Sequence, residues 1–300
     1  MHVTIPGRMA GALVLALAST ACVDIVGADF AKHVEREAKQ FSTPGTPDVH
    51  VTTFDGSIEI RPWDRAEVEV VIEKHARDKA DADDIDVHAE QSGNRVTVDV
   101  KSSKSGPGIH LGWSVSRSAR LIVSAPAASL IAARSGDGSI DVERMLGRLE
   151  LRSGDGSIRG RNLGGAVTAH TGDGSITLEG MAGALDVDSG DGRIVVAGKL
   201  SVVHAKSGDG SVTVRAEPGS APSGDWDITT GDGSVTVEVP EGFGAELDAH
   251  TGDGRVRLQD VAVSNVVGEM SKTTVRGRLG SGGPALRVRT GDGSITMRRP

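Results

Sequence analysis

The tripeptide Gly-Asp-Gly recurs along the second half of the chain, and this repeat constrains the fold more than any other feature. Its aspartates are 18 residues apart over the first five copies and more widely spaced afterwards: Asp137, Asp155, Asp173, Asp191, Asp209, Asp232, Asp253 and Asp292. Self-similarity at a fixed period is typical of repeat architectures, in which each unit buries its apolar side against its neighbours. The widest interval contains 270–277, which we interpret as a degenerate copy with Lys272 at the aspartate position. A related segment, FDGSIEI, lies at 54–60.

Each repeat unit is predicted to be two short strands joined by the GDG turn. Apolar residues alternate with charged and hydroxyl residues on both sides of the turn, and isoleucines stand at equivalent positions in Ile158, Ile176 and Ile194. Alternation with a period of two predicts strands with one apolar face. Such units can form an antiparallel meander or sandwich, in which Asp-Gly closes hairpins. They can also form a parallel solenoid, in which each unit is one coil.

Columns of identical residues favour the solenoid, because each side chain then stacks on its copy one coil away. We therefore predict an all-β fold, a right-handed parallel β-helix-like solenoid with coils of about 18 residues over 135–300. The antiparallel meander or sandwich is the alternative.

The repeats also resemble a known family. The phrases SGDGSI, TGDGSI and TGDGSV, with the segment FDGSIEIRPWDRAEVEVVIEK at 54–74, are similar to a bacterial β-strand-repeat family of unknown function, of the head-GIN type, whose members are provisionally named adhesins. The resemblance covers about residues 48–300. It implies a parallel β-helix-like fold and an envelope location, and it supplies no catalytic residues. The less regular part, 48–134, is expected to be an N-terminal β cap with irregular first coils, since a solenoid needs its open end covered.

The N-terminus has the layout of a secretory signal peptide over 1–21. Arg8 is followed by an apolar run over 9–18, which is too short to span a membrane, and small residues then lead to Cys22. Cys22 is the only cysteine, and it sits where a bacterial lipoprotein carries its lipid. The segment LASTAC resembles a lipobox but has Ser19 where that pattern has a larger aliphatic residue. We predict that Cys22 is lipidated, with conventional signal cleavage before it as the alternative.

Residues 22–47 are expected to form a lipid-anchored linker. Phe30, Val34 and Phe41 have near-helical spacing, which predicts a short amphipathic helix over 29–41. Together with the signal peptide, this predicts a protein that is secreted across the inner membrane. We expect it in the cell envelope, lipid-anchored on the periplasmic side or at the cell surface.

Composition excludes several classes of function. A net charge of -8 argues against a nucleic-acid partner, which would select a basic surface. Aromatic residues are 2% of the chain, too few for the stacking platforms that bind single strands or sugars. One cysteine allows no internal disulfide and no cysteine-based zinc cage.

The repeated aspartates are the first candidates for a site, as a cation ladder along the stack. Neighbouring coils lie about 4.8 Å apart, where two exposed carboxylates repel by roughly 0.9 kcal/mol, and calcium would offset this repulsion. One carboxylate per coil is few for calcium, so we predict structural turns whose glycines supply positive φ, and no cofactor or metal. The weak candidates for calcium are Asp137, Asp155, Asp173, Asp191 and Asp209. The Ser/Thr residue before each turn offers another alternative, a flat hydroxyl array for ice or a polymer.

The predicted function is a non-catalytic surface scaffold or binding module of the cell envelope, loosely an adhesin. The expected partners are the membrane, through the lipid anchor, and an extended polymer or a protein on the solenoid face. A polysaccharide-active β-helix enzyme is the alternative, because such enzymes need carboxylate pairs in a cleft. The short coils and the scarcity of aromatic residues argue against it.

Overall fold

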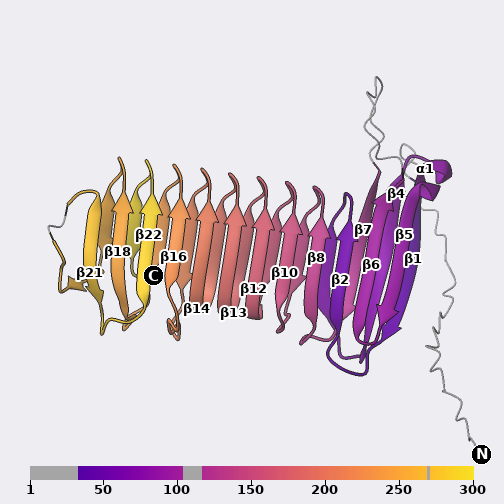
Figure 1. Cartoon of the computed structure of the whole chain (residues 1–300), viewed down its shortest axis with the longest axis horizontal. Coiled ribbons are helices and arrows are strands. Elements are labelled where there is room, and N and C mark those ends of the chain that lie inside the picture. The colour runs from indigo at the N-terminus through magenta and orange to yellow at the C-terminus, as the bar shows by residue number, and fades with distance from the viewer. Residues whose placement is uncertain (1–32, 104–116, 269–270) are drawn as a thin grey trace, which may run out of the picture.

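The computed structural model describes residues 33–103, 117–268 and 271–300, and they form a long stack of coils with two facing sheets (Figure 1). In each regular coil one strand ascends to a GDG turn and the next descends from it. The ascending strands are β2 (Asp48–Thr53), β6 (Arg95–Ser102), β8 (Leu130–Ser135), β10 (Leu149–Ser153), β12 (Gly164–Thr171), β16 (Trp226–Thr230), β18 (Ala245–Thr251) and β22 (Ala285–Thr290). The descending strands are β3 (Ile58–Pro62), β7 (Ser118–Ala125), β9 (Ile140–Glu143), β11 (Ile158–Arg161), β15 (Val212–Ala216), β17 (Val235–Glu238), β19 (Val256–Gln259) and β23 (Ile295–Arg298). Two longer strands, β13 (Ile176–Ser189) and β14 (Ile194–Ser207), descend, turn and ascend again.

Neighbouring coils pair in parallel and in register, which confirms the solenoid and excludes the meander. Ile176 stands opposite Ile158 on one side and Ile194 on the other. All three side chains are fully buried between the sheets. Within the described residues, antiparallel pairing occurs only at the two ends of the stack.

The order of the coils in space departs from the order in the sequence at both ends. The coil β2–β3 lies between β6–β7 and β8–β9. Likewise, the last coil, β22–β23, is inserted between β16–β17 and β18–β19. Insertion pairs both edges of a terminal coil, so neither of these coils is left with an open edge.

The degenerate copy predicted at 270–277 is wrong. Its described part leads into β21 (Thr274–Leu279), which pairs antiparallel with β18 and, with β20 (Val263–Ser264), covers the C-terminal end of the stack. Lys272 still lies against the turn of Asp253, because its carbonyl oxygen accepts from Val256 N at 2.8 Å, but the strand that follows it runs antiparallel to β18. The wide interval in the sequence holds this cap rather than a further coil.

The N-terminal cap corrects a second prediction. The helix expected over 29–41 is a strand from its first described residue, β1 (His33–Ser42). It pairs along its whole length with β4 (Glu67–Ala76). The ten-residue edge of β4 offers backbone hydrogen bonds that outweigh a weak helical periodicity. Cys22 and the predicted signal peptide lie outside the described residues.

The remaining cap elements are α1 (Lys79–Asp83), with Asp78 as its N-cap, and β5 (Ile85–Ser92). β5 and β6 form an antiparallel hairpin that turns at 93–94. Within the described part of the chain, no helix is both long and apolar enough to cross a bilayer.

Candidate functional site

The GDG turns form one edge of the stack, and their glycines are required by close packing rather than by positive φ. A Cβ on Gly174 would lie 2.3 Å from the carbonyl oxygen of Gly156 in the preceding coil, and one on Gly192 would lie 2.0 Å from that of Gly174. From Gly136 onward, none of the described GDG glycines has a φ in the left-handed region. The prediction that these glycines supply positive φ is therefore wrong. Glycine is required because the backbones of neighbouring turns are in contact.

The hydroxyl residue before each turn is buried and ties neighbouring coils together. Thr171 is fully buried, and its Oγ1 donates to the carbonyl oxygens of Gly154 and Gly156, at 3.0 and 2.9 Å. Ser189 repeats the contact to Gly174 O at 2.9 Å. The same pattern recurs along the stack, so these hydroxyls are structural and do not form an exposed array.

The aspartates of the turns stand in single file on this edge. The five candidates Asp137, Asp155, Asp173, Asp191 and Asp209 are all exposed, one per coil. Across the described residues, no three His, Cys, Asp or Glu side chains gather closely enough to hold a metal ion. Asp55, in the inserted first coil, extends the row, and burial followed by the neighbouring charge of Asp137 raises its pKa.

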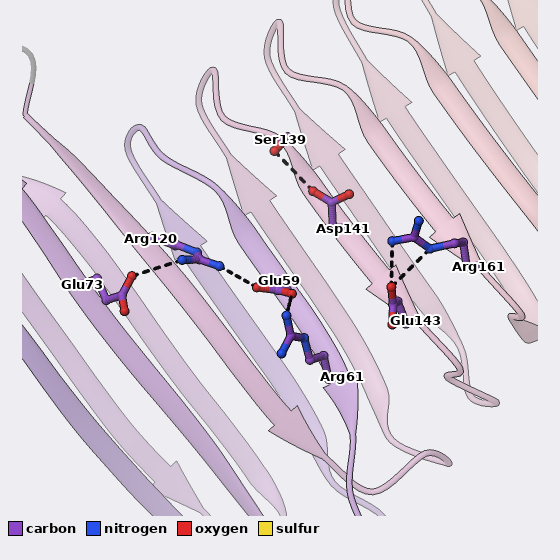
Figure 2. A network of polar contacts seen from close by, with 8 residues as sticks. All are labelled: Glu59, Arg61, Glu73, Arg120, Ser139, Asp141, Glu143 and Arg161. Carbon is purple, nitrogen blue, oxygen red and sulfur yellow. Dashed lines mark hydrogen bonds and ion pairs between the residues drawn. The ribbon is translucent and has the colours of Figure 1, made fainter.

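A shallow depression on the outer face of the descending strands is lined by charged side chains that contact one another (Figure 2). Its volume is about 320 Å³, and its lining side chains come from four adjacent strands and from the residue just before two of them: Ser57, Glu59, Arg120, Ser139, Asp141, Glu143 and Arg161. The strands β7, β3, β9 and β11 lie side by side here, so the depression spans the junction between the cap and the regular coils.

Glu59 is the centre of the network at the cap side of this depression. Its Oε2 accepts from Arg120 Nη2 at 2.8 Å, and Arg61 binds its other oxygen. Arg120 also donates to Glu73 of β4, at 3.4 Å. Burial would raise the pKa of Glu59, but the hydrogen bonds from Arg120 and Arg61 outweigh it and hold the pKa below its usual range.

The other side of the depression has a second set of pairs. Glu143 Oε1 accepts from Arg161 at 2.7 Å (Nη2) and 3.2 Å (Nε). Asp141 accepts from Ser139 at 3.4 Å and lies 3.6 Å from Arg159. The carboxylates and guanidiniums balance, and they are held on paired strands, so the depression presents fixed donors and acceptors to a polar ligand.

The sequence did not reveal this group. Glu59 and Asp141 are 82 positions apart in the printed sequence, and they become neighbours only because the first coil is inserted against the coil of β9. The available signal was the run of charged residues at the outward positions of the strands, in 59, 61, 120, 141, 143 and 161.

A second depression, of about 360 Å³, lies on the outer face of the ascending strands. Polar side chains from β13, β14 and β16 line it: Asp186, Asp188, His204, Lys206, Asp227 and Thr229. His204 stands between Asp186 and Asp227 in the strand register. Both outer faces of the solenoid therefore offer open polar hollows rather than an enclosed cleft.

Comparison with known proteins gives a family and several distant structures. A family model described as Toastrack DUF4097 matches residues 47–298. No curated protein matches the sequence.

Three solved structures illustrate the structural likeness. A provisionally named adhesin from Bacteroides fragilis NCTC 9343 is 14% identical, with a TM-score of 0.47, and the match covers 88% of this chain and 97% of that one. A provisionally named lipid binding protein from Parabacteroides distasonis ATCC 8503 is 13% identical, with a TM-score of 0.43 and coverage of 87% and 96%. A provisionally named cell adhesion protein from Clostridium sporogenes ATCC 15579 is 12% identical, with a TM-score of 0.31 and coverage of 89% and 100%. These likenesses are too distant to transfer a function.

Proposed function

Since the chain belongs to the Toastrack DUF4097 family, whose model matches almost all of the described fold, we propose that it is a non-catalytic binding scaffold of the cell envelope. The observation that carries the proposal is the depression around Glu59, an open hollow on paired strands that is lined by three carboxylates and two guanidiniums. Side chains fixed on paired strands lose little further freedom on binding. Such a surface suits an extended polar polymer that lies along the coils.

The chemistry of Glu59 argues for binding over hydrolysis. A glycoside hydrolase needs a carboxylic acid that keeps its proton, with a raised pKa, opposite a second carboxylate. The pKa of Glu59 is lowered, so this group is ionised near neutral pH and cannot donate a proton there. The polysaccharide-active alternative has one observation in its favour, the raised pKa of Asp55 beside Asp137 on the GDG edge.

Binding to purified envelope polysaccharide tests the proposal. We expect saturable binding by residues 33–300 that weakens at least about tenfold in Arg120→Ala, because two carboxylates then lose a charged hydrogen-bond partner. Arg152→Ala, an exposed arginine on the other sheet, is the matched control and should bind like the parent. Equal binding by both variants would contradict the assignment of the site, and release of new reducing ends would favour the enzyme.

The envelope address rests on the N-terminal sequence, and we propose that Cys22 carries the lipid. An unpaired thiol at the start of a secreted chain is otherwise a liability. Labelling cells with a palmitate analogue should tag the parent protein, and Cys22→Ser should lose the tag. Release of both forms in equal amounts into the soluble fraction would contradict lipid anchoring.

A further inference from the structure

The edge opposite the GDG turns has an unusual composition over five consecutive coils. We call the turns 126–130, 144–148, 162–166, 180–184 and 198–202 the lower edge, since they lie below the strands in Figure 1. These five turns contain Arg144, Arg148 and Lys199 and not one carboxylate. The GDG turns on the opposite edge carry an aspartate in every coil. Over these five coils the two edges therefore differ in charge, whereas the lower turns of the flanking coils carry Asp64, Glu217, Asp225 and Glu241.

The lower edge also exposes apolar side chains. Leu146 is 62% exposed and Leu130 is 42% exposed, which makes them two of the few large apolar residues on the described surface. Ala166 and Ala182 are exposed in the following turns. Hydrogen bonds between the turns, such as Gly164 N to Met145 O at 2.8 Å, hold them in register. These side chains form a short apolar ridge over four turns, with Asp48 beside Leu130 in the strand register.

The three cations of the lower edge are exposed, and within the part of the chain that the structure describes they form no ion pair. Arg144 has a φ of 51°, and Asn162 and Gly180, at the equivalent positions in the next two coils, have φ values of 55° and 66°. Asparagine and glycine tolerate this left-handed conformation, whereas arginine pays a conformational cost for it. A strained, unpaired arginine beside an apolar ridge is a reason to look for a ligand there.

We propose that the lower edge is a docking surface for an anionic phospholipid bilayer. Apolar side chains that enter the interface and cations that meet the headgroups are the two contributions that hold peripheral proteins on membranes. The aspartates do not cancel this attraction. The strand over 182–189 separates the two edges by roughly 26 Å at about 3.3 Å per residue, several times the Debye length of about 8 Å at physiological salt.

The proposed lipid anchor is compatible with this orientation. The strand order places His33 at the GDG edge, because β1 is antiparallel to β4, and β4 is antiparallel to the descending strand β7. From Cys22 to His33 the chain reaches at most about 36–40 Å when extended, which exceeds the height of the sheets. A bilayer that holds the anchor can therefore also contact the lower edge. The argument from the reach of the chain rests on the lipid anchor proposed above, and the other arguments for the docking surface do not.

Vesicle binding without the anchor tests the docking surface. Residues 33–300 contain every element described here, and we would measure their co-sedimentation with vesicles of phosphatidylcholine that contain one-third phosphatidylglycerol. We expect saturable binding that weakens roughly thirtyfold in Arg148→Glu, because this substitution changes the charge of the side chain from positive to negative, a difference of two units at the anionic surface. Leu146→Asp should also lose binding. Lys206→Glu, the same charge change at an exposed lysine of the ascending face, is the matched control and should bind like the parent.

Several results would overturn the proposal. The proposal fails if the parent does not bind, if it binds pure phosphatidylcholine vesicles as well as the anionic ones, or if Lys206→Glu loses as much binding as Arg148→Glu. Sedimentation velocity distinguishes another occupant, because a dimer that Leu146→Asp dissociates would assign the ridge to a second copy of the chain. The polysaccharide assay with Arg120→Ala and the labelling of Cys22 are independent of these results, so a failure here would leave the function proposed above intact.

Discussion

The hydroxyl contacts between coils make a sharp prediction at Thr171. Its side chain is fully buried, and its single proton is shared between two carbonyl oxygens of the preceding coil, those of Gly154 at 3.0 Å and Gly156 at 2.9 Å. Thr171→Val keeps the shape of the side chain and removes the hydroxyl. Thr171→Ser keeps the hydroxyl and removes the methyl group, and serine already stands at the equivalent positions in both neighbouring coils.

The two substitutions should differ in their cost. Serine loses one buried methyl group, worth about 0.8 kcal/mol. Valine loses the hydrogen bond and leaves buried carbonyl oxygens short of a donor, which costs about 1–3 kcal/mol. It also places a methyl group about 3 Å from oxygen atoms, closer than the usual carbon–oxygen contact of about 3.3–3.6 Å. We therefore expect valine to reduce the free energy of unfolding by about 2–3 kcal/mol and serine by less than about 1 kcal/mol.

Thermal melting and hydrogen exchange measure the difference. For a chain of this size, about 1 kcal/mol lowers Tm by roughly 2 °C, so Thr171→Val should melt about 4–6 °C below the parent. Amide protection should fall first in the strands on either side of the GDG turns at 154 and 172. If the valine variant is as stable as the serine variant, the hydroxyl is not what holds the coils together, and the interpretation of the whole column is wrong.

Four further predictions use the same logic. Ile176→Asp places an unpaired charge between two buried isoleucines and should cost several kcal/mol; a Tm within about 2 °C of the parent would contradict the core that we describe. Gly174→Ala should destabilise far more than Gly242→Ala, because a Cβ at 242 has no atom within 4 Å, so only its positive φ is strained; equal losses on denaturant titration would refute the close-packing argument. Calcium should raise Tm no more than magnesium does, and a calcium-specific rise that Asp173→Asn removes would make the aspartate row a metal site. Hydrogen bonds from its neighbouring arginines hold the pKa of Glu238 below its usual 4.5, so its contribution to stability is present above that pH and lost as the pH falls through the lowered pKa; Glu238→Gln should unfold with a weaker dependence on acid pH than the parent.

The regular coils could be predicted because consecutive repeats in the sequence become consecutive coils in the stack. The alternation around Ile158, Ile176 and Ile194 fixes which face is buried, and the constant interval fixes the register between coils. The columns of hydroxyl residues and glycines were also visible in the sequence, but their structural roles were not. Whether a glycine serves a positive φ or a close approach depends on the distance between coils, which no single repeat contains.

The ends of the stack could not be predicted in the same way. A short segment such as 33–42 has a weak helical pattern of its own, and it becomes a strand because β4 offers a long unpaired edge. The insertion of the last coil before its predecessor in space likewise follows from competition between edges, not from local sequence. The depression around Glu59 could not be predicted for the same reason, because it forms where an inserted coil meets the cap.

The strictness of the repeat itself indicates where binding is to be sought. At the GDG edge, glycine touches backbone and the buried hydroxyl bonds to the preceding coil, so each coil must carry the same residues for the next to stack. A surface that is the same in every coil cannot distinguish one position along the stack from another. The outward positions and the lower edge are not held to the repeat, and there Glu59, Arg120 and Arg148 differ from their counterparts in neighbouring coils. Specific recognition on this solenoid should therefore be carried by the residues that break the repeat.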